Sequence, residues 1–173
     1  MAFRVAMIVA VLIALLLIFA ATKPATLHVQ RSIVINAPPE KVFALINNLH
    51  RWPDWEPQDD STVTRAFSGP ESGVGAASEW DSRGQAGKGK MFITDSQPSN
   101  RVAVKVDFVK PFHSHNVNTF TLAPSGSATN VTWSWEGQNL YFMKVMEIFM
   151  NMDQMMGKHF EDGLANMKNL AEK

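Results

Sequence analysis

An uncharged apolar run near the start of the chain suits a lipid environment, whereas the rest of the chain suits water. From Val5 to Thr22 no side chain is charged, whereas charged, aromatic and β-branched residues mix from Lys23 onward. At about 1.5 Å per helical residue, this run just covers a hydrocarbon layer roughly 27–30 Å thick. We therefore expect an N-terminal transmembrane anchor at residues 1–22, a linker at 23–26 and a folded domain at 27–173.

Two other interpretations of the apolar run are weaker. A cleaved signal peptide needs small residues at the −3 and −1 positions. Cleavage after Ala21 would place Phe19 at −3, and cleavage after Ala20 would place Ile18 there. A buried core helix would normally carry a polar face, which this run lacks. An uncleaved anchor is the preferred interpretation.

The charges that flank the run indicate an orientation by a small margin. Arg4 and the α-amino group precede the run, and Lys23 follows it. The positive-inside rule then favours a cytoplasmic N-terminus. We expect a single-pass membrane protein whose domain is extracytoplasmic, and periplasmic in a bacterium.

The composition of the remaining chain excludes several functional classes. Sixteen Lys or Arg balance sixteen Asp or Glu, and only Arg4 of the basic residues lies within the expected anchor, which leaves a net charge near −1 after residue 22. Nucleic-acid binders usually show a basic excess or stripe, so no nucleic-acid partner is expected. The chain has no cysteine, which excludes disulfides, thiolate nucleophiles and Cys-based metal sites. The whole chain has five Trp, eleven Phe and ten Met, and most of these large apolar side chains lie in the domain.

Hydrophobic periodicity predicts a strand and two short helices at the start of the domain. Residues 27–36 alternate between apolar and polar side chains, as in a half-buried strand. Pro38 and Pro39 end this strand and suit the first turn of a helix, because proline lacks the N–H group that would be unpaired there. Apolar residues between Val42 and Leu49 give that helix a buried face, and a second short turn is expected at His50 to Trp55.

The rest of the domain is predicted to contain antiparallel strands followed by one long helix. Between Thr62 and Glu136, Gly, Pro, Ser and Asn separate β-rich segments at hairpin spacing. From Leu140 to Lys173, apolar residues recur every three or four positions, with a separate turn expected before the main helix. This order of elements indicates an α+β fold. Where the long helix does not lie flat on the sheet, we expect a cavity between them.

Several local sequences after Thr26 have counterparts in one known family. They are RSIVINAPPEKVF at 31–43, WPDW at 52–55, SGP at 68–70, GVGA at 73–76, DFVKPF at 107–112, VTW at 131–133 and GKHFEDGL at 157–164. With the order of elements, they resemble the START-like superfamily, also called SRPBCC, and most of all its polyketide cyclase/dehydrase and lipid transport branch. The resemblance implies a helix-grip fold, in which a curved antiparallel sheet wraps around a long C-terminal helix. It does not indicate one activity, because the family includes cyclases, lipid carriers and receptors for hydrophobic ligands.

Candidate ligand-binding residues are the large apolar side chains expected between the sheet and the long helix, together with two Trp in the turn after the first helix. Trp provides wide apolar walls, and Met adapts to ligands of varied shape. The same residues would also serve as an ordinary core, and the two Trp of the turn would serve as a cap on it. The candidates are Trp52, Trp55, Trp80, Met91, Val104, Val106, Phe108, Trp133, Trp135, Phe149, Met152, Met156 and Phe160.

Ionisable residues are expected to lie mainly outside the cavity. Glu79 and Asp81 alternate with Trp80, as Lys88 and Lys90 do with Met91, which places these charges on the solvated face. A few polar residues near the mouth, such as Glu56, His113 or Asn116, would orient a ligand.

The sequence provides no catalytic constellation and no cofactor motif. It contains no Gly-x-Ser-x-Gly sequence, and its glycine-rich segment at 84–89 lies in an expected turn rather than between a strand and a helix. His113 and His115 stand two residues apart, but no third ligand has a suitable spacing, so no metal site is predicted. We therefore predict no catalytic residue and no cofactor.

These observations favour a membrane-anchored domain that binds or transports a hydrophobic small molecule or lipid. One alternative is a polyketide cyclase/aromatase-like enzyme, which would need an ionisable residue inside the cavity to move protons. Another is a protein-interaction module that presents the aromatic residues as an exposed patch. A void lined by Trp133 and Trp135 would favour the carrier. A buried acid or His at that void would favour the enzyme, and a filled core would favour the interaction module.

Overall fold

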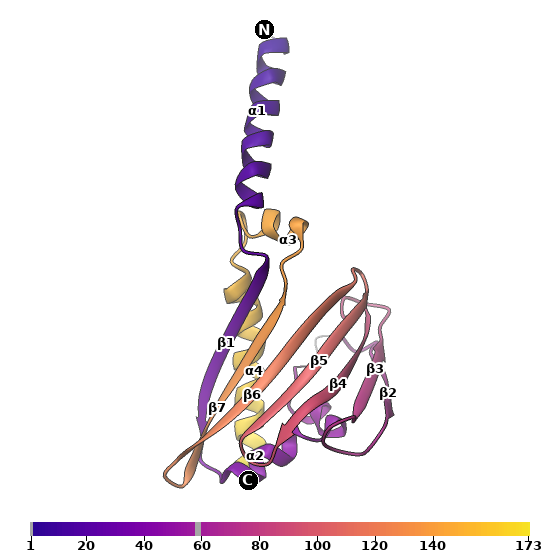
Figure 1. Cartoon of the computed structure of the whole chain (residues 1–173), viewed down its shortest axis with the longest axis vertical. Helices are drawn as coiled ribbons and strands as arrows, with labels where there is room; N and C mark the ends of the chain where they lie inside the picture. Colours follow the sequence, from indigo (N-terminus) through magenta and orange to yellow (C-terminus); the bar gives the residue numbers. More distant parts are fainter. Residues whose placement is uncertain (1, 58–59) are drawn as a thin grey trace.

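One curved antiparallel sheet of seven strands dominates the computed structural model, which describes residues 2–57 and 60–173 (Figure 1). The strand order is β1-β7-β6-β5-β4-β3-β2, so β2 to β7 follow one another as hairpins and β1 joins at the edge beside β7. The strands are β1 (Thr26–Ile35), β2 (Thr64–Ser68), β3 (Ala77–Asp81), β4 (Lys88–Gln97), β5 (Arg101–Lys110), β6 (Ser114–Ser125) and β7 (Ala128–Gln138).

Helices cover the inner face of this sheet and extend the molecule at one end. They are α1 (Ala2–Ala21), α2 (Pro39–Ile46), the 3₁₀ helix η1 (Leu49–Asp54), α3 (Tyr141–Met146) and α4 (Met152–Ala171). In Figure 1, α4 lies behind β1, β7 and β6, while α2 lies at the end of the sheet away from α1. The predicted α+β helix-grip architecture is confirmed.

The separate turn expected before the main C-terminal helix is present as α3. α3 ends at Met146 and α4 begins at Met152. Asn151 caps α4, because its side-chain oxygen accepts a hydrogen bond of 3.0 Å from the backbone N–H of Gln154. Phe149 therefore lies in the connection between the two helices and is 70% exposed, instead of belonging to one continuous apolar stripe.

An aromatic cluster joins η1, the sheet and α4. Trp52 and Trp55 both have edge contacts with Phe120 of β6, and Trp133 of β7 stacks on Phe160 of α4 with ring centroids 4.4 Å apart. The indole N–H groups of Trp52 and Trp55 donate to the carbonyl oxygens of Ile46 and Leu45. These bonds satisfy the polar atoms of two buried Trp and fix η1 against α2.

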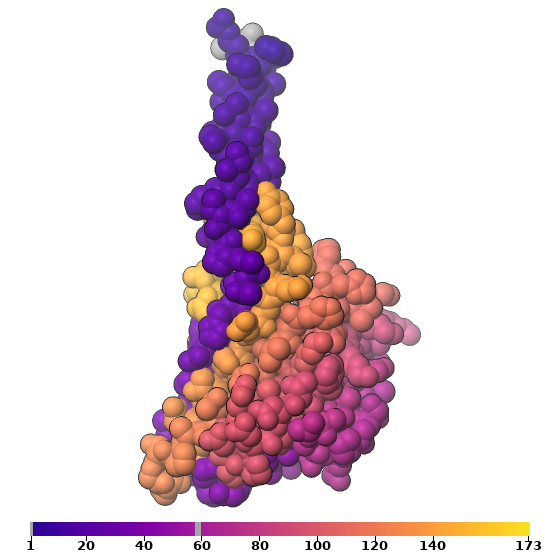
Figure 2. All heavy atoms as spheres, viewed as in Figure 1, coloured from indigo at the N-terminus to yellow at the C-terminus, as the bar shows by residue number. Residues whose placement is uncertain are grey.

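Helix α1 projects away from the sheet along the long axis of the molecule (Figures 1 and 2). Its mean hydropathy is 2.9, and it is long and apolar enough to cross a membrane. Nearly all of its side chains are exposed. A signal sequence near an N-terminus meets the same criteria.

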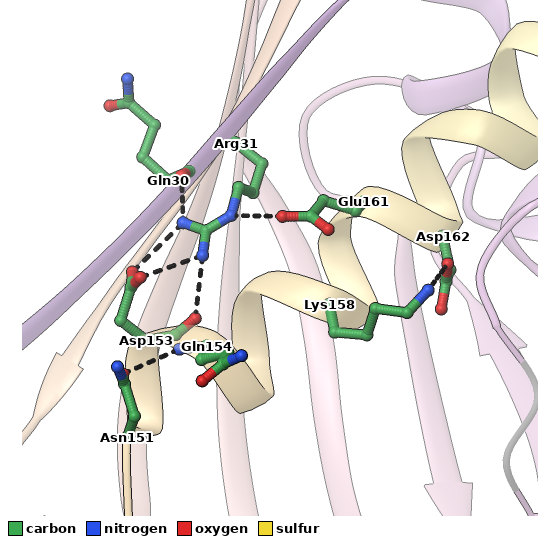
Figure 3. A network of polar contacts seen from close by, with 8 residues as sticks. All are labelled: Gln30, Arg31, Asn151, Asp153, Gln154, Lys158, Glu161 and Asp162. Carbon is green, nitrogen blue, oxygen red and sulfur yellow. Dashed lines mark hydrogen bonds and ion pairs between the residues drawn. The ribbon is translucent and has the colours of Figure 1, made fainter.

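A polar clamp fastens the N-terminal half of α4 to β1 (Figure 3). Arg31 of β1 bonds to the carboxylates of Asp153 at 2.9 Å and Glu161 at 2.8 Å, and also to the backbone carbonyl of Asp153. The guanidinium lowers the pKa of the Asp153 carboxyl below its usual value. Gly157 lies directly beneath this guanidinium, where a Cβ atom would overlap it. The missing side chain thus makes room for the clamp.

We predict that Gly157→Ala has opposite effects with and without Arg31. In the native background, the new methyl group displaces the guanidinium from Asp153 and Glu161, which cancels or reverses the helix-propensity gain of about 1 kcal/mol. In an Arg31→Ala background that gain is realised, and the free energy of unfolding rises. Denaturant titrations of the four proteins measure the coupling. Equal effects of Gly157→Ala in both backgrounds would contradict the close contact.

Candidate functional site

A pocket of about 390 Å³ lies between the sheet and the N-terminal half of α4. This volume is within the range usual for small-molecule sites, and most of the lining is apolar. The large apolar side chains that line it are Trp52, Trp80, Met91, Val106, Phe108, Trp133, Trp135, Met156 and Phe160. Smaller and polar residues complete the lining: Glu56, Pro57, Asp60, Val63, Arg65, Gln85, Ala86, Asn118 and His159.

The pocket occupies one half of the inner face, and the same boundary crosses several strands. On β5, Val106 and Phe108 line the pocket, whereas Val104 is fully buried in the core. In the same way, Met91 of β4, Asn118 of β6 and Trp133 of β7 line the pocket. Their neighbours two positions away, Ile93, Phe120 and Val131, belong to the filled core. Helix α2 packs against β5, β6 and β7 beyond this boundary. The filled half is therefore the half that α2 and η1 cover.

Strand pairing places the pocket at the end of the sheet from which α1 emerges. β1 begins at Thr26, directly after α1, and Leu27 pairs with Gly137 of β7. Continuing across the sheet, Gly137 pairs with Asn116, Asn116 with Val106, and Val106 with Met91. Trp80 and Phe108 lie closer to the α1 end than this row, whereas Asn118, Trp135 and Trp133 extend the pocket beyond it toward the middle of β6 and β7.

Trp80 forms one wall of the pocket and is fixed on three sides. Its indole N–H donates to the carbonyl of Ala86 at 3.0 Å, and its ring has an edge contact with Phe108. Its pairing partner on β4 is Gly89, where a Cβ atom would collide with the indole. Glycine at 89 therefore lets the large ring lie flat against the neighbouring strand.

Charged side chains enter the pocket, which corrects the expectation that ionisable residues lie mainly outside it. Arg65 of β2 and Glu56, which follows η1, form an ion pair of 2.9 Å, and their side chains are only 16% and 17% exposed. His159 of α4 also lines the pocket, with its ring beside that of Trp133. Strand parity had correctly placed Glu79 and Asp81 outside, where they pair with Lys90 and Lys88.

Asp60 ties together two segments that line the pocket. Its carboxylate accepts hydrogen bonds from the hydroxyls of Ser82 and Thr62 and from the backbone N–H of Ala86. These bonds, led by that from Ser82, hold the pKa of Asp60 well below its usual value. The carboxylate is therefore ionised throughout the neutral range and fastens the β3–β4 hairpin to the segment before β2.

Nine of the thirteen predicted ligand-binding residues line this pocket, and four lie elsewhere. Trp55 and Val104 are fully buried core residues, because η1 and α2 fill their half of the inner face. Phe149 and Met152 lie near the break between α3 and α4, where they line a separate surface hollow with Lys23 and Leu27. The two helices do not continue one another, so these side chains do not face the pocket.

Of the three polar residues expected at the mouth, Glu56 lies in the pocket and the other two do not. His113 is exposed in the β5–β6 turn, so it does not share a strand face with His115. Asn116 is buried outside the pocket and donates to Ser114. Asn118, two residues further along β6, lines the pocket and accepts a 2.8 Å bond from the Trp133 indole.

Sequence reasoning missed Asp60, Arg65, Asn118 and His159, and two of them carried a usable signal. His159 follows Met156 by three positions, so helical spacing places both on one face of α4. Arg65 is two residues from both Val63 and Phe67, so strand parity places it on the same inward face as these apolar residues. Among the described residues, no group of three His, Cys, Asp or Glu has an arrangement that would hold a metal ion.

The family profile described as "Polyketide cyclase / dehydrase and lipid transport" matches residues 26–172. The chain belongs to this family. No curated protein matches the chain. Among solved structures, norcoclaurine synthase from Thalictrum flavum is similar, with 13% identity, a TM-score of 0.62, and coverage of 88% of this chain and 90% of the enzyme.

Two further structures share the fold. A Chromobacterium violaceum protein is 18% identical, with a TM-score of 0.61 and coverage of 87% of this chain and 99% of its own. The Aha1 dimer from Colwellia psychrerythraea is also 18% identical, with a TM-score of 0.56 and coverage of 84% and 96%. At these identities the likeness establishes the helix-grip fold and leaves the ligand open.

Proposed function

We propose that the protein binds a hydrophobic small molecule or lipid in the pocket and holds it beside a membrane. The observation that carries this proposal is the position of nine large apolar side chains around one void, Trp133 and Trp135 among them. Burial of apolar ligand surface would contribute about 25 cal/mol per Å² before ordering costs. The Glu56–Arg65 pair and Asn118 supply polar groups that orient the ligand.

The size of the pocket restricts the ligand. Its volume of about 390 Å³ lies toward the lower end of the range of roughly 300–1,000 Å³ for small-molecule sites. A compact hydrophobic molecule or a single acyl chain fits this space better than a lipid with two chains. We therefore expect one small apolar ligand with few polar groups.

Native mass spectrometry of residues 23–173, purified without detergent, tests ligand binding when the retained molecules are extracted and identified.

We predict that Met156→Trp reduces hydrophobic-ligand uptake and leaves the domain folded, because the larger Trp side chain would occupy the void of the pocket. Overpacking a filled core would instead cost about 1–3 kcal/mol. The matched control is Met155→Trp, at an exposed neighbouring position on α4. A marked fall in melting temperature with unchanged binding would show that Met156 is structural.

The second part of the proposal is that α1 is a retained anchor at residues 1–22, joined by a linker at 23–26 to the domain at 27–173. It is supported by the length and hydropathy of α1 and by the poor cleavage sites near its end. The small excess of positive charge before α1 favours an extracytoplasmic domain. An anchor on this side of the sheet would keep the pocket near a source of lipid.

We predict that the full-length protein remains in the membrane fraction after an alkaline carbonate wash. A single apolar helix of this length inserts stably, whereas a peripheral protein is released by the wash. Mass spectrometry of the intact protein provides the control for processing. Recovery of a mature chain beginning near Thr22 or Ala25 would identify α1 as a signal peptide.

A second candidate function is acid–base catalysis of the cyclase or aromatase type. The observation that favours it is the presence of Glu56, Arg65 and His159 at the pocket. Histidine is the side chain best suited to exchange protons near neutral pH. Because Glu56 and Arg65 compensate each other's charge at 2.9 Å, His159 is the stronger candidate for a general acid or base.

The two functions predict different behaviour for His159→Gln. For a carrier, ligand affinity stays within about tenfold, or roughly 1.4 kcal/mol, because the apolar walls are unchanged. For an enzyme, turnover of a polyketide-like or steroid-like substrate falls by about 10²–10⁴-fold. Affinity and turnover measured on one preparation separate these outcomes, with exposed His113→Ala as the control. If turnover is lost in the His159→Gln variant and not in the control, and the variant is folded, the enzyme proposal replaces the carrier proposal.

A further inference from the structure

A cluster of exposed apolar side chains lies at the base of α1 and has no role in the pocket. It comprises five residues of α3 and the α3–α4 connection, which we call the α3 patch: Tyr141, Phe142, Met146, Phe149 and Met150. Phe149 is 70% exposed, a high value for a Phe outside α1. Large apolar residues gathered this densely on a surface usually mark a contact with a partner or a membrane.

Hydrogen bonds fix the α3 patch at a defined height along α1. The Tyr141 hydroxyl donates to the carbonyl oxygen of Leu17 at 2.7 Å, and Lys144 Nζ donates to the carbonyl oxygen of Lys23 at 2.9 Å. Leu17 lies four residues before the end of α1, which corresponds to about 6 Å of helix. The segment thus lies beside the last turn of α1, as the orange atoms against the indigo column show in Figure 2.

We propose that residues 141–150 form a second membrane contact, inserted in the interfacial layer of the leaflet through which α1 leaves the bilayer. This inference rests on the anchor in the proposed function. Where α1 emerges from hydrocarbon, anything fixed beside Leu17 is held at the depth of the headgroups and upper acyl chains. Tyr is enriched at this level, and Lys extends its ammonium group toward the phosphates.

The charges of the segment fit a lipid surface. Lys144 and Lys23 lie together at the level where lipid phosphates are found, and both are cationic. The one acidic residue of the segment, Glu147, is turned back toward the domain, where it accepts a bond of 2.8 Å from the Asn139 side chain. Apolar side chains with flanking cations are the pattern of an interfacial membrane segment.

The contact would fix how the domain sits on the membrane. A single helix can tilt in the bilayer together with the domain fixed to it, whereas two membrane contacts define the tilt of the domain. The α3–α4 connection leads directly into the half of α4 that carries Met156 and Phe160, so the membrane contact adjoins a wall of the pocket. The pocket end of the sheet would then be kept toward the bilayer.

Single-cysteine labelling of the full-length chain tests this proposal cleanly, because the chain has no cysteine. Phe149→Cys, Leu12→Cys and Val74→Cys are each labelled with a nitrobenzoxadiazole fluorophore in phosphatidylcholine–phosphatidylglycerol vesicles. Leu12 reports the span, and Val74, exposed beside α2, is the matched apolar control at the far end. Doxyl lipids quench the fluorescence of a label that lies within the bilayer, and aqueous dithionite quenches a label that is exposed to water.

We expect the Phe149 label to be quenched by shallow doxyl lipids and protected severalfold from dithionite relative to the Val74 label. This corresponds to burial about 5–10 Å into the headgroup and acyl boundary. A protected Leu12 label with a Phe149 label as reactive as that at Val74 would overturn the interfacial contact and leave the anchor intact. A reactive Leu12 label would overturn the anchor and this inference with it. Protection of Phe149 that depends on protein density in the membrane would show a second copy of the chain and also overturn the proposal.

Discussion

The placement of α4 along one edge of the sheet is the constraint from which the pocket follows. α4 packs mainly on β1 and is held there by Arg31 and by the stacking of Trp133 on Phe160. A seven-stranded curved sheet has more inner surface than one helix can cover, and α2 with η1 covers only the end away from α1. The remaining apolar surface faces a void, so the clamp on β1 and the open space near β4 and β5 are two results of the same packing.

The ionisable groups of the pocket come from outside the central strands, which affects what the site can do. Arg65 lies on the edge strand β2, Glu56 follows η1, and His159 lies on α4. The charges of Arg65 and Glu56 compensate each other at 2.9 Å, so this pair leaves little net charge of its own to attract an ionic ligand. The central strands contribute apolar walls instead. This combination fits the proposed ligand, which is mostly apolar with few polar groups, and the alternative proposal of His159 as a general acid or base.

Local patterns in the sequence predicted the strands, their facing and nine of the pocket residues, because parity and helical spacing depend only on neighbouring positions. They did not separate Val106 from Val104, which have the same parity and chemistry, since the difference lies in whether α2 covers them. Trp55 was assigned to the pocket together with Trp52, because the sequence does not show which of these two Trp residues of one turn reaches the pocket. A separate turn before the main helix was expected, and the start of α4 was predictable too, because Asn151 followed by Gln154 is a helix-capping pattern. The Arg31 clamp was not, since it joins positions more than a hundred residues apart.

The position of the pocket relative to α1 is a consequence of topology. β1 follows α1 directly and β7 leads directly into α3, and the two strands are antiparallel partners at the sheet edge. The start of β1 and the end of β7 must therefore lie at the same end, which brings α1 and α3 together. α4 starts from that end as well, so its first turns, which carry Met156 and His159, are the ones that face the uncovered half of the sheet. In this chain, the apolar helix before the first strand therefore emerges at the end of the sheet where α4 begins and the inner face is left uncovered.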